Sequence, residues 1–394
     1  MAGRQYDILV FGATGFTGRR IVQHLATEAG FKGTWAIAGR DRSRLEALAA
    51  SLSGGTAPGI VVADVASPDS LLAMARSCAV CINTFIERME LLYDDAAKAA
   101  GVYVASAVGF DSVPGDLGYT LAQFKPPARC TQVECALTIQ GGPNGFRGHY
   151  PTYQSAVFGF ASAGELRKLR KEAEQKRGKP DLKVPGPKLP RQTGAAWDER
   201  FNAWTFPFMG ADASVVRRTM ARVDPPANVS IVFTLPSRMY MTLWQGFGAA
   251  FAFLAQREWG RNLLLKYPRM FSYGEWRTCK RCCMFTHEGP SEQQMAETTF
   301  AFTNIGRGYA TGAPASPDQQ PDMEIVTRVS GPEPGYIACS VFIVQAAITL
   351  LEEKGKLPAL GVHTPASLLW GTGYVDRLRA HGIKFEVVDS AAVQ

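Results

Sequence analysis

The chain has 394 residues, of which 46% are hydrophobic and 20% are charged. This balance excludes a wholly disordered protein, and 39 glycines with 24 prolines are too few for a collagen-like or low-complexity chain. Eight cysteines are too few for a disulfide scaffold, and a net charge of +7 is mild for this length. The run Ile8–Phe11 is too short for the core of a secretory signal. We therefore expect no signal peptide, a cytosolic start, reduced thiols and roughly two or three domains.

The first organised unit joins a strand to a helix through a glycine-rich turn. Residues 7–11 (DILVF) form an apolar run typical of a buried parallel strand, and residues 19–27 carry apolar side chains at helical spacing. The turn at 12–18 reads GATGFTG. Glycines in that position permit a tight turn, let a pyrophosphate approach the backbone and let the helix pack closely on the strand. In the alternative, the turn has a purely structural role.

The N–H groups at the start of such a helix bind phosphates, helped by the positive end of the helix dipole. The spacing GxxGxxG resembles the nucleotide-binding turn of extended short-chain reductases. The sequence therefore predicts a dinucleotide site at this turn, built from Gly12, Thr14, Gly15, Phe16, Thr17 and Gly18.

The next strand decides which dinucleotide is expected. Residues 34–38 (TWAIA) are followed by Gly39 and Arg40, where a dinucleotide fold meets the adenosine ribose. An acid there accepts a hydrogen bond from the 2′-hydroxyl of NAD, whereas an arginine pairs with the 2′-phosphate of NADP. Arg42 and Arg44 follow, and Asp41 comes just after the strand end. We therefore expect NADP rather than NAD. In the alternative, Arg40 merely starts a solvated helix.

Two more strands continue the pattern. Residues 60–63 lead into Asp64, an acid placed to contact the adenine amino group or, in the alternative, to cap a turn before Ser67. Residues 79–83 end in Asn83, where the phosphates or the nicotinamide ribose of the cofactor would pass. Strands and helices that alternate in this way predict an α/β fold with a Rossmann-type, doubly wound parallel sheet.

The later chain predicts a second, α+β domain. After a helix at 87–99 and a strand at 102–106 comes the loop GFDSVPGDLG, in which we expect Asp111 to close a turn and Asp116 to cap a helix that begins near Leu117. We expect strands of an antiparallel sheet at 131–140, 229–235, 298–305, 323–329 and 384–388, and helices at 155–171, 336–354 and 375–381. The predicted units are a dinucleotide-binding domain at 1–125, a substrate or dimerisation domain at 126–360, and a C-terminal helix and strand at 361–394 that return to the core.

Two segments of the second domain have an unusual composition. Residues 165–191 carry ten Lys and Arg against four acids and end in a proline-rich stretch, which is typical of an exposed basic linker. No nucleic-acid partner is expected, because this segment lacks interleaved aromatics and no nucleic-acid module is present. Residues 239–256 carry no charge. Three interpretations are open: a spanning helix, a buried core helix that the pattern alone favours, or a hairpin in a lipid monolayer with 263–271 as its second limb.

Several strings resemble the saccharopine dehydrogenase-like oxidoreductases, most closely their vertebrate type. They are FGATGFTG, AGR, GFDSVPGDLG, PFMGADASVVRRT, GPEPGYIA, VQAAITLL and HTPAS, in order along nearly the whole chain. The resemblance implies a Rossmann-type cofactor domain, a mixed second domain and NAD(P)-dependent oxidoreductase activity. Mycobacterial relatives are trans enoyl reductases of lipid synthesis, and the vertebrate type is associated with lipid droplets and membranes. It therefore implies a small, lipid-linked substrate and a membrane or lipid-droplet surface on the cytoplasmic side. Mitochondrial association and a homodimer are further expectations.

The chain departs from the family pattern at two places. In the family, the strand that ends at Asn83 is followed by a Gly-Pro-Tyr loop, a helix, a strand and a Gly-Glu turn, and only then by the helix at 87–99. About one βα unit, roughly thirty residues, is therefore expected to be missing here. The second departure is a local insertion at 276–288, where Cys279, Cys282, Cys283 and His287 form an incomplete ligand pattern. No metal is expected.

The sequence assigns no catalytic residue. A reductase needs a proton donor near the hydride acceptor, and no YxxxK pair occurs in a suitable place. Four histidines have no partner visible in the sequence, namely His149, His287, His363 and His381. Two hypotheses follow: an NADP-dependent oxidoreductase of lipid or glycolipid metabolism, and a non-catalytic lipid-surface protein that retains the nucleotide-binding fold.

Overall fold

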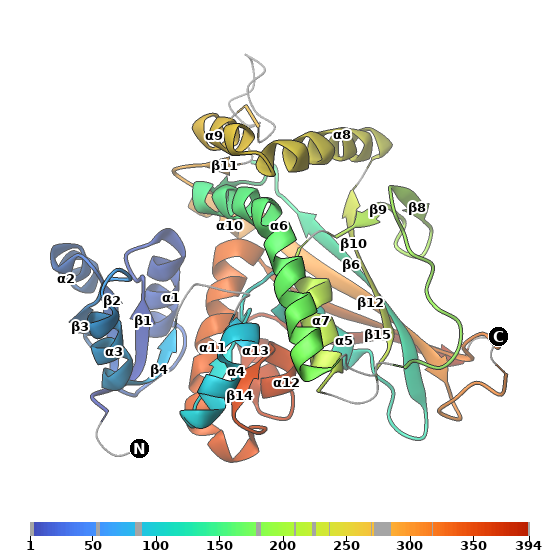
Figure 1. Cartoon of the computed structure of the whole chain (residues 1–394), viewed down its shortest axis with the longest axis horizontal. Helices are drawn as coiled ribbons and strands as arrows, with labels where there is room; N and C mark the ends of the chain where they lie inside the picture. The colour runs from blue at the N-terminus through green and yellow to red at the C-terminus, as the bar shows by residue number, and fades with distance from the viewer. Residues whose placement is uncertain are drawn as a thin grey trace.

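The structure, a computed structural model, describes residues 4–52, 56–82, 89–178, 183–208, 210–222, 226–235, 237–268, 270–271, 285–316 and 318–392. A parallel sheet with its helices forms one side of the molecule, and a long, twisted mixed sheet forms the other (Figure 1). Helix α11 (Cys339–Glu352) stands between them. Its Phe342 packs in the core of the mixed sheet, and its Ile348 packs in the core of the parallel sheet.

The parallel sheet has four strands in the order β3-β2-β1-β4. Its strands are β1 (Tyr6–Phe11), β2 (Trp35–Gly39), β3 (Gly59–Val62) and β4 (Cys78–Ile82), and its helices are α1 (Phe16–Thr27), α2 (Arg42–Ala50) and α3 (Pro68–Ser77). Val10 lies opposite Ile37 of β2 and Ile82 of β4. Alternate side chains of β1 enter different cores, because Val10 packs with α1 and α11 whereas Leu9 packs with Met74 of α3. The predicted doubly wound α/β fold is confirmed.

The parallel sheet ends at β4 among the described residues. The next strand, β5 (Tyr103–Ala105), pairs instead with β14 (Gly361–His363) in a separate two-stranded parallel sheet. Helix α4 (Met89–Ala99) holds β14 in place, because the Asp94 carboxylate accepts a hydrogen bond of 2.9 Å from the N–H of Val362. The C-terminal segment therefore returns to the first half of the chain.

The mixed sheet has seven strands in the order β15-β13-β12-β6-β10-β9-β8. The strands are β6 (Arg129–Gln140), β8 (Ala196–Asp198), β9 (Ala203–Pro207), β10 (Asn228–Leu235), β12 (Thr299–Tyr309), β13 (Met323–Pro332) and β15 (Lys384–Ala392). All neighbours are antiparallel except β6 and β10, which run parallel with Val133 opposite Val229. The predicted antiparallel sheet is therefore mixed, because the chain passes through helices between β6 and β10 and re-enters in the same direction.

One face of the mixed sheet carries the second core. Besides α11, the helices that contribute to it are α5 (Val113–Leu121), α7 (Asp212–Met220), α12 (Pro365–Leu369) and α13 (Tyr374–Ala380). Their buried side chains meet Val133, Phe302 and Val329 of the strands. Helix α5 packs here although it precedes residue 125, so the predicted boundary at 125 separates it from its packing partners. The domain division stays a prediction.

The predicted helix at 336–354 is made of two parts. A π-helical turn (Pro334–Ala338) precedes α11, and the buried carboxylate of Glu333 accepts hydrogen bonds from the N–H groups of Gly335, Tyr336 and Ile337. Within the described residues, Pro334–Glu352 is the helix long and apolar enough to cross a membrane, and 67% of its apolar window is buried in the protein. It is a core helix by this measure. A 3-10 turn (Lys354–Lys356) follows α11.

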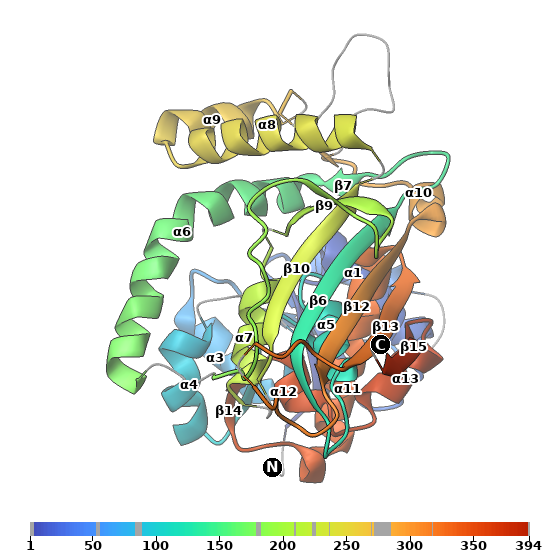
Figure 2. The same cartoon turned by 90° about the vertical axis from the view of Figure 1, so that its right-hand side faces the viewer.

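Helices α8 (Arg238–Ala255) and α9 (Glu258–Lys266) form a layer at one end of the molecule. They lie across the first part of α6 (Tyr150–Arg177), which then runs down one side (Figure 2). Tyr153, Phe251 and Leu264 form the small core between these helices. The short strands β7 (Gly148–His149) and β11 (Phe285–Thr286) pair beneath them, near α10 (Glu292–Glu297).

The predicted linker at 165–191 is only partly a linker. Helix α6 continues to Arg177, and the described residues 183–191 lie against the mixed sheet. The side-chain amide of Gln132 on β6 donates to the carbonyl of Pro187 at 2.8 Å. Prolines cannot extend a helix, but their carbonyls still accept hydrogen bonds, which allows this segment to pack.

Candidate functional site

The glycine turn follows β1 and is hydrogen-bonded to the end of β2. Gly12 adopts a φ of 78°, a conformation that favours glycine. The N–H groups of Gly12 and Ala13 donate to the carbonyl of Ala38 at the end of β2, at 2.9 and 3.2 Å. Gly15 donates back to the carbonyl of Gly12 at 3.0 Å. The turn is therefore a tight loop whose position is set by both strands.

Gly18 and Gly15 have different reasons to be glycine. A Cβ at Gly18 would lie 2.2 Å from the Gly12 carbonyl oxygen, so helix α1 could not approach the strand this closely with any side chain. A Cβ at Gly15 would meet the same oxygen at 3.2 Å, a much smaller conflict. Gly15 is exposed at the turn. Gly18 therefore serves packing, and Gly15 keeps the outside of the turn open.

The start of α1 has hydrogen-bond donors without acceptors. In the described part of the chain, the N–H groups of Thr14, Phe16 and Thr17 donate to no other group. Gly15, at the N-cap, provides no side-chain cap, and the first turn contains no acid. Unpaired N–H groups together with the helix dipole form an anion site. The predicted phosphate-binding turn is thus exposed at Gly12 and Gly15, and no side chain of the described residues accepts a hydrogen bond from its free N–H groups.

A cavity of about 740 Å³ begins at this turn, a volume within the usual range for small-molecule sites. It lies between the two halves of the molecule. Its lining comprises Thr14, Gly15, Phe16, Arg19, Arg20, Gln23, Arg44, His149, Pro151 and Glu292.

Aromatic side chains close one wall of this cavity. The ring of Phe16 stacks on His149 with centroids 4.4 Å apart and meets Tyr336 edge-on at 4.8 Å. Burial lowers the pKa of His149, so the ring is neutral at physiological pH. The sequence missed His149 as a site residue, because its partners come from distant parts of the chain. The sequence likewise showed no partner for His287, whose ring stacks on Tyr150 with centroids 4.2 Å apart.

The ribose end of the predicted site has an exposed arginine and two acids that are engaged locally. Arg40 is exposed at the end of β2 and is not among the residues that line the cavity. The Asp41 carboxylate accepts from the N–H of Arg44 at 3.1 Å and so caps α2. One oxygen of Asp64 accepts from the N–H of Ala66 at 2.9 Å, which is the turn-capping alternative. Gly39 is buried within β2, and Asn83 lies outside the described residues.

Three of the motifs outside the nucleotide turn meet at a second place, around α5. Asp116 lies in the first turn of α5, not before a helix that begins at Leu117. Tertiary contacts determine the role of Asp116. Its buried carboxylate accepts hydrogen bonds from the Thr219 hydroxyl of α7 and, at 2.8 Å, from the N–H of Ala366 of α12. Burial raises the pKa of Asp116 to about 6. The strings GFDSVPGDLG, SVVRRT and HTPAS therefore converge here.

Asp212 adds an unusual carboxyl group to the same cluster. Its side chain is fully buried, and neither of its oxygens has a hydrogen-bond partner among the described residues. Burial, followed by the nearby carboxyl of Asp111, raises its pKa well above the usual value. A Cβ at Gly115 would lie 2.7 Å from its Oδ1, so the carboxyl fills the space that glycine leaves on α5. Burial thus favours the protonated, neutral form of this carboxyl group.

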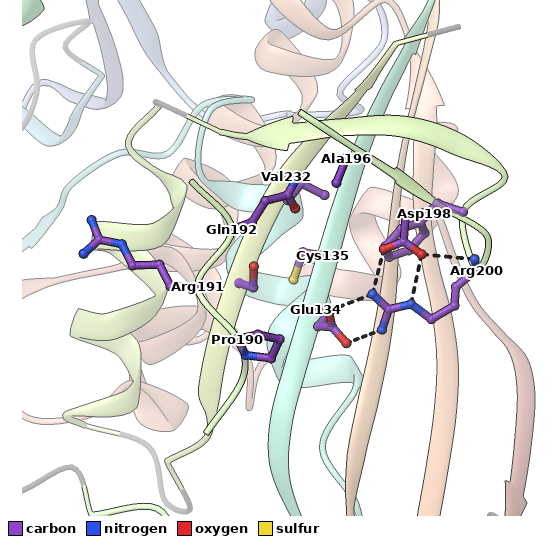
Figure 3. Close-up of a pocket in the computed structure, with 11 residues that line it drawn as sticks. Glu134, Cys135, Pro190, Arg191, Gln192, Ala196, Asp198, Arg200 and Val232 are labelled. Atoms are coloured by element: carbon purple, nitrogen blue, oxygen red, sulfur yellow. Dashed lines mark hydrogen bonds and ion pairs between the residues drawn. The ribbon is translucent and has the colours of Figure 1, made fainter. Parts of the chain in front are cut away.

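A smaller cavity of about 180 Å³ lies on the other face of the mixed sheet (Figure 3). Arg200 spans its edge and binds Glu134 of β6 at 2.9 Å and Asp198 of β8 at 2.7 Å. Arg307 binds Glu134 as well. These charges neutralise one another, so we interpret the network as structural. Cys279, Cys282 and Cys283 lie outside the described residues, and the described residues contain no cluster of three metal-ligating side chains.

The segment at 239–256 forms most of helix α8, which is buried on one side and exposed on the other. Met241, Phe251 and Ala255 of α8 face α6, whereas Met239 and Phe253 are 65% and 52% exposed. On α9 and the residues after it, Trp259, Tyr267 and Met270 are also exposed. The Arg257 guanidinium lies 3.5 Å from the centre of the Phe253 ring. Of the three open interpretations, a fully buried core helix does not fit, because α8 packs on α6, α9 and the ends of β9 and β10 with one side and leaves the other exposed. We call the exposed set Met239, Phe253, Trp259, Tyr267 and Met270 the apolar surface.

Comparison with known proteins agrees with these features. Residues 8–112 match the saccharopine dehydrogenase NADP binding domain. A human protein named saccharopine dehydrogenase-like oxidoreductase is 33% identical over an alignment of 438 positions that covers 99% of both chains. The chain belongs to the saccharopine dehydrogenase-like oxidoreductase family. The predicted family is confirmed, and with it a nucleotide-binding domain of the NADP type.

Two further relatives of the chain carry names that refer to a location. A Caenorhabditis elegans protein named lipid droplet localized protein is 31% identical over 97% of this chain and 98% of its own. An Arabidopsis thaliana protein named probable mitochondrial saccharopine dehydrogenase-like oxidoreductase is 30% identical over 99% and 98%. The alignment with the human relative is longer than this chain, so that relative carries residues without a counterpart here. This fits a missing βα unit after Asn83, which stays a prediction.

Proposed function

We propose that this protein binds NADP(H) at the glycine turn and transfers hydride between the cofactor and a small, lipid-linked molecule. The observation that carries the proposal is the open start of α1, where the N–H groups of Thr14, Phe16 and Thr17 have no acceptor among the described residues and Thr14, Gly15 and Phe16 line a cavity large enough for a ligand. These groups hold the diphosphate, and Gly15 lets it approach. The bound cofactor supplies the hydride chemistry, and the chain supplies position and charge.

Charge at the adenosine end favours NADP over NAD. The cavity has three arginines in its lining, and Arg40 is nearby at the end of β2. The acid that follows, Asp41, is engaged in capping α2 and is not free to accept from a ribose hydroxyl. The family match to an NADP binding domain supports the same choice.

The apolar surface supports action at a lipid surface. It is exposed on two helices at one end of the molecule, and Arg257, Arg261 and Lys266 accompany it. Exposed aromatic and aliphatic side chains next to basic ones are typical of helices that lie in a lipid interface. Such a surface would hold the enzyme on the cytoplasmic side of a membrane or lipid droplet, with the lipid-linked substrate nearby. The lipid-droplet and mitochondrial names of two relatives make both organelles targets for a localisation experiment.

A second candidate is a lipid-surface protein that keeps the nucleotide-binding fold without turnover. The observation that favours it is the sheet, which ends at β4 while β5 pairs with β14 elsewhere. A βα unit between them would complete the nicotinamide end, so its loss would spare adenosine binding and reduce hydride transfer. A homodimer remains a prediction for either candidate.

One experiment separates the two candidates. The melting temperature of the full chain is measured with and without NADPH, and NADPH oxidation is then followed with lipid-linked enoyl and carbonyl substrates. A rise in melting temperature with turnover supports the oxidoreductase, because a ligand that binds only the folded state stabilises it. A rise without turnover supports the non-catalytic candidate, and no rise refutes nucleotide binding in both.

A further inference from the structure

The cavity at the glycine turn contains arginines that differ in their partners. Arg20 forms an ion pair with Glu292 of α10, so its charge is compensated. Outside the lining, Arg42 pairs with Glu46 on the exposed face of α2 at 3.6 Å. In contrast, the described residues offer no carboxylate partner to the guanidinium of Arg19 or Arg44. Arg19 is engaged only through its Nε, which donates to the carbonyl of Thr14 at 3.3 Å.

These two arginines belong to neighbouring helices that begin at the same edge of the sheet. Arg19 lies one turn into α1, directly after the unpaired N–H groups, and Arg44 lies in the first turn of α2. Leu25 of α1 and Leu45 of α2 pack in the same core, so both helices cover the same face of the sheet. Both guanidiniums therefore line one cavity together with Thr14 and Gly15.

Two guanidiniums without a carboxylate partner among the described residues favour a ligand that carries more negative charge than the diphosphate bound by the turn. Each phosphate of a dinucleotide diphosphate carries one negative charge, which peptide N–H groups and a helix dipole satisfy. A phosphate monoester carries about two charges at neutral pH, and arginine binds it through paired hydrogen bonds. The carboxylate in the cavity lining, Glu292, is engaged by Arg20, and that of Asp41, which precedes α2, accepts from the Arg44 N–H.

We propose that Arg19 and Arg44 together hold the 2′-phosphate of NADP(H), and that they, rather than Arg40, discriminate NADP from NAD. The inference rests on the proposed function, because it requires the dinucleotide at the glycine turn. It differs from the sequence prediction, in which Arg40 was the partner of this phosphate. Arg40 serves as the matched control, since it is an exposed arginine next to the cavity but outside its lining.

The test uses ligands that do not depend on the nicotinamide end. Adenosine 2′,5′-bisphosphate, AMP, NADPH and NADH are titrated by calorimetry into the full chain and into Arg19→Gln, Arg44→Gln and Arg40→Gln. Arg19→Gln and Arg44→Gln are each expected to weaken adenosine 2′,5′-bisphosphate about tenfold or more, because each removes a charge-assisted contact. Binding of AMP and NADH should change less than about threefold, and Arg40→Gln should leave the preference for the 2′-phosphate in place.

Each contrary result has a distinct meaning. If Arg40→Gln removes the preference while Arg19→Gln and Arg44→Gln keep it, the assignment to this pair is wrong. Equal affinity of the unaltered chain for NADPH and NADH also overturns it, but leaves dinucleotide binding intact. If neither nucleotide binds the unaltered chain, the proposed function fails and the inference fails with it. Unfolding curves of each variant show that a loss of affinity does not come from loss of the fold.

Discussion

Substitution by alanine at Gly15 and at Gly18 is expected to have opposite consequences for stability and cofactor binding. In Gly18→Ala, the new Cβ would lie 2.2 Å from the Gly12 oxygen, whereas unstrained carbon contacts are about 3.5 Å. Helix α1 must therefore move away from the turn, and we expect the free energy of unfolding to fall by about 1–3 kcal/mol. In Gly15→Ala the closest contact is 3.2 Å, and the φ of −71° suits any residue. That variant should therefore fold normally.

The two variants should differ just as clearly in cofactor binding. The Gly15→Ala methyl group stands on the exposed side of the turn, so it keeps a diphosphate away from the N–H groups of Thr14, Phe16 and Thr17. We expect NADPH affinity to fall at least about tenfold while stability stays the same or rises by up to about 1 kcal/mol. Urea unfolding measures the stability, and NADPH fluorescence measures the affinity. A folded Gly15→Ala chain that binds NADPH as tightly as the unaltered chain would refute the reasoning.

Three further predictions concern other parts of the molecule. Burial raises the pKa of Asp116 from 3.8 to about 6, so the folded state holds a proton that the unfolded state loses as the pH rises from about 4 to 6. Stability should fall over this window by up to about 3 kcal/mol, and urea midpoints of Asp116→Asn should lack that part of the pH dependence; identical profiles would contradict it. Phe253→Glu in the apolar surface should reduce flotation with anionic phospholipid vesicles several-fold, whereas Val387→Glu, at an exposed position of β15, should not; equal flotation of both would refute a lipid-facing role. Inserting the human relative's βα unit after Asn83 should increase NADPH turnover and leave adenosine 2′,5′-bisphosphate affinity unchanged, and a chain with unaltered turnover would argue against the missing unit.

The local parts of the fold were predictable because they depend on neighbouring residues. Apolar runs and glycine spacing identify β1, the turn and α1, and the open N–H groups follow from that order of elements. The uncharged segment at 239–256 was predicted with three environments left open, because its composition does not decide between them. A helix with buried and exposed apolar sides has the same composition as a core helix, and only the packing on α6 distinguishes them.

The predictions that were wrong and the site residues that were missed depend on contacts between distant segments. Asp116 has the pattern of a cap for its own helix, but it accepts a hydrogen bond from Ala366, 250 residues away. His149 meets Phe16 only after β7 and the start of α6 are placed against the glycine turn. The convergence of Asp116, Asp212 and Thr219 likewise comes from packing of α5 against α7. The motif strings signalled importance for these residues, but their spacing along the chain contained no information about distance.

The central claim is that the main-chain N–H groups at the start of α1 bind the diphosphate of a dinucleotide. Hydrogen–deuterium exchange of the turn peptide with and without saturating NADPH tests it most directly. We expect slower exchange at Thr14, Phe16 and Thr17 in the presence of NADPH, because these amides have no acceptor among the residues that the structure describes. NADPH binding that leaves exchange at these three amides unchanged would contradict it.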